Sequence, residues 1–151
     1  MRGSIQMLAA VASIFATAEV ALGQTVADSA KKWGLLGTWS VDCSKPASGS
    51  NSYLTYTARE GRVYHEREFG DRRDANAVLL AKITNDNSIE LLIRFEGLSQ
   101  TRQFVMMKGS DGRIRAKWNR NVDTGEYSIK DGKLVGSGAE SVWQKRCPVK
   151  R

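Results

Sequence analysis

The chain has few of the residues from which metal and redox centres are built. Its 151 residues include one histidine, His65, and two cysteines, Cys43 and Cys147. A structural zinc site normally takes four Cys or His ligands, so these side chains are too few. The cysteines also lack the Cys-x-x-Cys spacing of redox-active pairs. We therefore expect no metal site and no cofactor.

The sequence also lacks an apolar run long enough to span a bilayer, which takes about 20 residues. The apolar stretch 7–18 is shorter, follows the basic residue Arg2 and precedes small residues. This order is typical of a secretory signal peptide. We predict that residues 1–23 are removed by cleavage before Gln24, with exits after residue 18 or 27, or a helix kept in the mature fold, as alternatives. Residues 24–151 then form a single domain of a periplasmic or secreted protein without a membrane span.

An isolated cysteine pair in an oxidising compartment is usually a disulfide. Cys43 and Cys147 lie near the two ends of the predicted domain, about 100 residues apart. Closing a loop of that length restricts the unfolded chain by about 4.7 kcal/mol in the chain-entropy model. We predict that this pair is a structural disulfide.

Proline is nearly absent, and helical periodicity is weak. Pro46 and Pro148 lie outside every predicted strand, and turn clusters rich in Gly, Asn and Asp separate β-prone segments. In residues 88–95 the apolar side chains recur with the period of two that is typical of a strand. Only residues 27–36 suggest a short helix. The predicted strands are 37–43, 53–59, 62–69, 77–84, 88–95, 101–108, 113–119, 126–130 and 133–145. The sequence predicts an all-β antiparallel meander.

A long meander exposes two edges unless it closes on itself. In the first and last predicted strands a tryptophan lies four residues before a cysteine: Trp39 before Cys43, and Trp143 before Cys147. We therefore expect these strands to pair and close a small barrel of eight or nine strands. Nine strands make the pair parallel and bring the two cysteines to one rim. Eight make it antiparallel and separate them by roughly 20 Å unless the tail turns back.

The triplet Gly37-Thr38-Trp39, preceded by a short helix, resembles the G-x-W entry of lipocalins and related calycin barrels. The resemblance implies a small β-barrel in which a basic residue after the last strand, Arg146 or Lys145, packs over Trp39. The chain also resembles small bacterial exported barrels with a "GTW…DC" start. That Trp39 contact implies antiparallel closure, whereas the disulfide implies parallel closure or a returning tail. We expect the closure to be the one that the disulfide requires.

Residues suited to catalysis are sparse. We interpret His65 as a half-exposed strand residue, because no nucleophile or set of metal ligands accompanies it. Glu66 and Glu68 share one face of a strand, which is more typical of a solvated surface than of a carboxylate pair. We therefore predict that the protein is not an enzyme.

Basic residues outnumber acidic ones, and the formal net charge is +7. A basic surface favours anionic partners, which for an exported protein are envelope components rather than nucleic acid. The predicted strand 113–119 places cations on one face and the apolar side chains of Ile114, Ala116 and Trp118 on the other. The candidate anion site consists of Arg113, Arg115, Lys117 and Arg120. The alternative is a solvated face, with Glu126 as the nearest neutralising acid.

Two functional hypotheses follow. In the first, the protein is an exported binding barrel that holds a small apolar or amphipathic ligand. The residues assigned to its interior are Trp39, Leu91, Ile93 and Trp118. In the second, it is an interaction protein with a filled core that acts through its surface, as a protease inhibitor or an envelope-binding module. An interior cavity distinguishes the first from the second.

Overall fold

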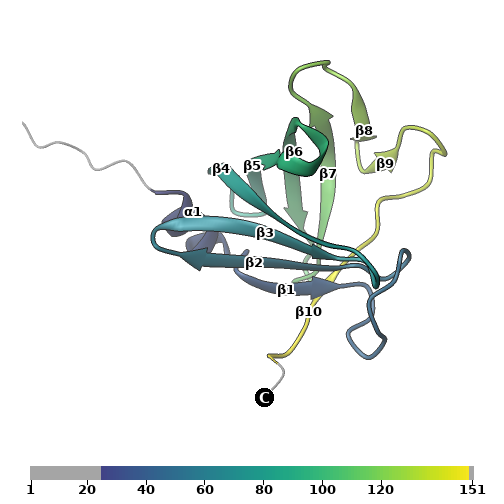
Figure 1. Cartoon of the computed structure of the whole chain (residues 1–151), viewed down its shortest axis with the longest axis horizontal. Helices are drawn as coiled ribbons and strands as arrows, with labels where there is room; N and C mark the ends of the chain where they lie inside the picture. The colour runs from purple at the N-terminus through teal and green to yellow at the C-terminus, as the bar shows by residue number, and fades with distance from the viewer. Residues whose placement is uncertain (1–24, 150–151) are drawn as a thin grey trace, which may run out of the picture.

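The protein is one antiparallel sheet that curls on itself. The structure is a computed structural model that describes residues 25–149, so the predicted signal peptide lies outside the described residues. Ten strands pair in the order β10-β1-β2-β3-β4-β5-β6-β7-β8-β9 and form a curled half-barrel (Figure 1). This confirms the all-β antiparallel meander with a short helix before its first strand.

The strands and helices follow the chain with short connections. They are α1 (Val26–Trp33), β1 (Gly37–Ser40), β2 (Tyr53–Arg59), β3 (Arg62–Glu68), β4 (Arg73–Asn85), β5 (Ser88–Phe95), the 3-10 turn η1 (Glu96–Leu98), β6 (Gln100–Lys108), β7 (Ile114–Asn121), β8 (Tyr127–Lys130), β9 (Lys133–Leu134) and β10 (Lys145–Arg146).

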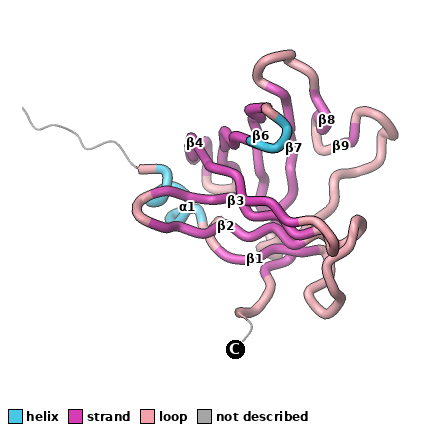
Figure 2. Tube along the Cα trace, viewed as in Figure 1, coloured by secondary structure: helices cyan, strands magenta, loops and turns pink. Residues whose placement is uncertain are grey.

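Helix α1 packs against β3 and β4 at one end of the half-barrel (Figure 2). Thr25 caps its first turn by accepting the backbone N–H of Asp28, whose carboxylate accepts the Thr25 N–H in return. Gly34 ends the helix in the left-handed conformation, with φ of 83°. Ala30 and Trp33 are buried against the sheet. The helix is therefore shorter than the predicted range 27–36, because Gly34 terminates it.

The core lies on the concave, inner face of the curled sheet. Strand β5 supplies its centre, where Ile89, Leu91, Ile93 and Phe95 are at most 2% exposed and alternate with partly exposed neighbours. This confirms the period-two prediction for β5. Trp39 is buried in the same core, and its Nε1–H donates to the Leu35 carbonyl at 2.8 Å.

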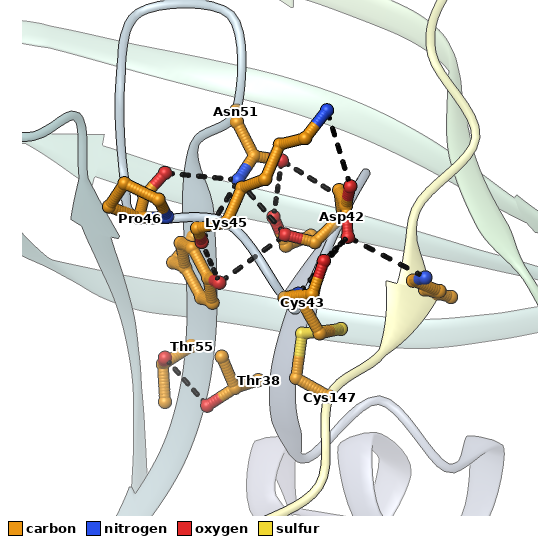
Figure 3. Close-up of a disulfide and its surroundings, with 12 residues drawn as sticks. Thr38, Asp42, Cys43, Lys45, Pro46, Asn51, Thr55 and Cys147 are labelled. Carbon is orange, nitrogen blue, oxygen red and sulfur yellow. Dashed lines mark hydrogen bonds and ion pairs between the residues drawn. A yellow bond between two sulfur atoms is a disulfide. The ribbon is translucent and has the colours of Figure 1, made fainter.

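The first and last strands pair as predicted, but the pair is antiparallel, with Trp39 opposite Arg146. The expectation of parallel closure is therefore wrong. The predicted strand 37–43 ends at Ser40, and the chain then turns, so that Cys43 lies beside Cys147 (Figure 3). The Cys43–Cys147 disulfide is confirmed, with a Cα–Cα distance of 5.5 Å. It is thus compatible with antiparallel strands, because Cys43 lies outside β1.

The Trp39–Arg146 contact explains the glycine of the triplet. Of the two basic residues considered, Arg146 stacks its guanidinium 5.5 Å from the Trp39 ring centre and donates to the Leu36 carbonyl. A Cβ on Gly37 would lie 2.8 Å from that guanidinium, and the Gly37 φ of 127° disfavours any side chain. Gly37 therefore makes room for the cation that covers Trp39.

Closure of the sheet differs from the predicted eight- or nine-stranded barrel. The predicted strand 133–145 is divided into β9 and β10, so the meander has ten strands and its ends are β9 and β10. A backbone β-bridge connects the last segment to β7: the backbones of Gln144 and Ile114 exchange hydrogen bonds of 2.8 and 2.9 Å. Residues 144–146 therefore contact both β7 and β1 and join the two sides of the half-barrel.

Strand β7 carries a bulge that the sequence analysis did not anticipate. Met106 pairs with Ala116, but the preceding Val105 pairs with Trp118, which leaves Lys117 as the extra residue. Because an extra residue reverses the alternation, Trp118 lies on the convex face, 5.4 Å from the Tyr127 ring. The prediction that Trp118 shares the inner face with Ile114 and Ala116 is therefore wrong.

Candidate functional site

The concave face holds a pocket of about 430 Å³. Strands β2, β3, β6 and β7 form its walls, together with the β8–β9 hairpin and residues 141–144. Most of its wall is apolar, and the apolar residues that line it include Leu54, Tyr56, Phe104, Met106, Ile129 and Leu134. Leu134 and Val142 are 40% and 59% exposed and mark its mouth. A mainly apolar pocket of this size is typical of a site for a small organic molecule.

His65 lies in the wall of this pocket within a cluster of aromatic rings. Its imidazole stacks on Tyr56 at 4.9 Å, and it meets Phe95 and Phe104 at centroid distances of 5.9 and 6.4 Å. The side chain is 3% exposed, so the interpretation of His65 as a half-exposed strand residue is wrong. Its position follows from register: β2 and β3 pair Tyr56 with His65, and paired residues share a face.

His65 is neutral at physiological pH. Burial lowers the pKa of the imidazole to about 3, and the nearby Arg67 cation acts in the same direction. Neither ring nitrogen has a hydrogen-bond partner. The same burial raises the pKa of the Tyr56 phenol. The aromatic part of the pocket therefore carries no charge.

Arg67 is the one cation in the wall of this pocket, and its charge is already compensated. Its Nε–H donates to Asp74 Oδ1 at 2.9 Å, and a second guanidinium nitrogen contacts the other carboxylate oxygen. Asn76 Nδ2 donates to the same carboxylate at 2.8 Å. These contacts lower the pKa of Asp74, and the guanidinium stacks 4.5 Å from the Phe95 ring centre. Arg67 and Asp74 thus form a bidentate ion pair at the edge of the pocket.

The residues predicted to line the interior are elsewhere. Trp39, Leu91 and Ile93 are between 0 and 3% exposed and form the packed core, and none of them lies in the wall of the pocket. Trp118 is on the convex face. Tyr56, His65 and Phe104 were not among the predicted site residues. The alternation of β2 and β3 carried a signal for the first two, but finding the pocket also required their pairing register and the curvature of the sheet.

The structure brings Arg113 and Arg115 of the predicted anion row together, and both are neutralised. Arg113 pairs with Asp111 at 2.6 Å, and Arg115 pairs with Glu140 at 2.7 Å, so the partners are not Glu126. Both guanidinium groups stack on the ring of Trp143. Arg120 donates to Gln103 at 2.8 Å, and Lys117 is exposed on the bulge.

Comparison with known proteins finds no family model, no curated protein and no solved structure that matches this chain. Within residues 25–149, no helix has the length and apolar character needed to cross a membrane. In the same range, no three His, Cys, Asp or Glu side chains gather as metal ligands do.

Proposed function

We propose that the protein is an exported, non-enzymatic binding protein that holds a small apolar or amphipathic molecule in the pocket on its concave face. The observation that carries the proposal is the pocket itself, about 430 Å³ in volume with aromatic and aliphatic walls. Binding there removes apolar ligand surface from water, which contributes about 25 cal/mol per Å² before the costs of association.

The disulfide supports export. Cys43 and Cys147 are bonded to each other, and no free cysteine is found among the described residues. Stable disulfides of this kind belong to oxidising compartments. The apolar stretch at residues 7–18 after Arg2 supports the same assignment.

The chemistry of the pocket supports binding rather than catalysis. A histidine base needs a nucleophile or substrate proton within hydrogen-bond reach and a pKa near the working pH. His65 has no hydrogen-bonded hydroxyl or thiol beside it, and its pKa of about 3 makes it a weak base. Its ring contributes apolar surface to the wall.

The surface-acting alternative has less support. Two of the four cations assigned to the anion site, Arg113 and Arg115, are ion-paired. An anionic partner would have to displace Asp111 and Glu140, or bind through Lys117 and Arg120 alone.

A dye-binding experiment tests the proposal. N-phenyl-1-naphthylamine fluoresces when it enters an apolar site, and we expect saturable binding to the mature protein. Ala116 lies in the wall of the pocket, so Ala116→Phe fills it and reduces the affinity at least about tenfold. Ala75 is exposed on β4, and Ala75→Phe is the matched control that leaves binding unchanged. Absence of saturable binding, or equal loss in both variants, contradicts the proposal. Native mass spectrometry of protein purified from its own host then identifies the natural ligand.

A further inference from the structure

We propose that the pocket selects uncharged amphipathic ligands, with a hydroxyl or amide head group on an apolar body, and rejects the corresponding carboxylates. This inference rests on the proposed function and specifies the class of ligand. It is carried by the state of Arg67, Asn119 and Ser141 in the wall of the pocket and of Arg102 beside it.

The cation in the wall is already paired with a carboxylate of the protein. Arg67 donates its Nε–H to Asp74 Oδ1, and Asn76 Nδ2 donates to the same oxygen. A ligand carboxylate near Arg67 would meet the Asp74 charge as well. Transferring a charged group into an apolar site without a partner is unfavourable, so binding of the anion is disfavoured.

Another cation of the concave face is also committed to neutral partners. Arg102 donates its Nε–H to Asn119 Oδ1 at 2.6 Å, and its other nitrogens donate to Gln100 and Ser128. It does not lie in the wall of the pocket. Arg102 affects the pocket only indirectly, through Asn119. Because Arg102 occupies the Oδ1 acceptor of Asn119, the N–H₂ group of that amide remains as a donor for a ligand.

The remaining polar groups in the wall are neutral and of both kinds. Asn119 offers donors, and Ser141 Oγ donates its own hydrogen to the Ala116 carbonyl at 2.7 Å, which leaves its lone pairs as acceptors. The ring nitrogens of His65 are themselves buried, so the imidazole adds no hydrogen-bonding group to this set. A hydroxyl or amide both donates and accepts, so it matches this set, whereas a carboxylate only accepts.

Competition between matched ligands tests the inference. Dodecanol, dodecanamide and dodecanoate share one apolar chain and differ in the head group. At a pH near 8 the acid is fully ionised, and each compound is titrated against the bound naphthylamine dye. We expect dodecanol and dodecanamide to displace the dye at least about tenfold more tightly than dodecanoate. Equal or tighter binding of dodecanoate overturns the selectivity while the proposed binding function stands.

A variant in which Arg67 loses its carboxylate partner tests whether the Arg67–Asp74 ion pair causes the selectivity. Asp74→Asn removes the charge that compensates Arg67, so we expect dodecanoate to bind at least about tenfold more tightly and dodecanol to bind as before. Glu68→Gln is the matched control, because Glu68 pairs with the exposed Arg73 outside the pocket. An unchanged dodecanoate affinity in Asp74→Asn that has a native circular dichroism spectrum contradicts the role given to the ion pair.

If Asp74→Asn does not fold, the competition of the three compounds for wild-type protein still tests the inference. If the dye binds and none of the three compounds displaces it, the inference is wrong. If the dye itself does not bind, the proposed function fails, and the inference fails with it.

Discussion

The surroundings of His65 differ strongly from those it would have in the unfolded chain. Its imidazole lies among Tyr56, Phe95 and Phe104, with no hydrogen bond to either nitrogen. The unfolded chain takes up the proton at the ordinary pKa of 6.5, whereas burial lowers the pKa to about 3 in the folded protein. Below pH 6.5 the unfolded state therefore binds more protons than the folded state, and stability falls as the pH falls.

We predict that the free energy of unfolding decreases by up to about 1.4 kcal/mol per pH unit between pH 6 and pH 4. His65→Phe keeps the aromatic packing and removes the titrating group, so this slope disappears in the variant. Urea unfolding across the pH range measures it. The carboxylates whose pKa is lowered, such as Asp74 and Asp111, lose their contribution only below about pH 4, so they do not produce the same slope. A slope that is the same in both proteins contradicts this account of His65.

At the scale of the elements, β5 and β7 show what the sequence could predict and what it could not. In β5 every second residue is apolar and buried, so the alternation alone located the strand and its inner face. In β7 the bulge at Lys117 moves Trp118 to the convex face, and the sequence carries no mark of it, because a bulge depends on the pairing with β6. The pocket was hidden for a similar reason: its walls come from strands that only the curvature of the sheet brings together.

The prediction named the correct pair of strands for closure of the two chain ends, but the expected parallel orientation of that pair was wrong. The cysteine spacing identified β1 and the last strand, but not the turn after Ser40 that allows antiparallel strands to carry the disulfide. Strand β10 is only two residues long, so the disulfide and the Arg146 contacts supplement few ladder hydrogen bonds. The disulfide is therefore the main link that holds β10 to β1 at this edge of the sheet.

We predict that Cys43→Ala/Cys147→Ala lowers the free energy of unfolding by about 2–5 kcal/mol, as loss of a disulfide closing a long loop typically does. Urea unfolding of the variant and the wild type measures the difference. Non-reducing peptide mapping of the wild type should recover the two cysteines in one linked pair. Wild-type protein that contains two free thiols, or a variant as stable as the wild type, contradicts this role.

At the scale of the whole molecule, the described fold begins at its helix cap. Thr25 caps α1, and the predicted cleavage before Gln24 leaves this cap in the mature chain. Cleavage after residue 27 would remove Thr25 and the first two residues of the helix. The structure thus gives a physical reason to prefer the earlier of these two exits.

We predict that the mature protein from an exporting host begins at Gln24, and that Thr25→Ala in this chain costs about 1 kcal/mol of stability through loss of the cap. N-terminal sequencing and urea unfolding measure the two effects. An N-terminus at Met1 contradicts the export assignment, and a start after residue 27 contradicts the structural role of the cap.

We propose that the concave face of the half-barrel binds a small uncharged amphipathic molecule. A two-dimensional nuclear magnetic resonance titration of the mature protein with dodecanol tests this binding and locates it. We predict saturable shifts at pocket residues, including His65, Phe104 and Ala116, and none at Lys117 or Ala75, which are exposed. Unchanged spectra, or shifts confined to the convex face, would contradict it.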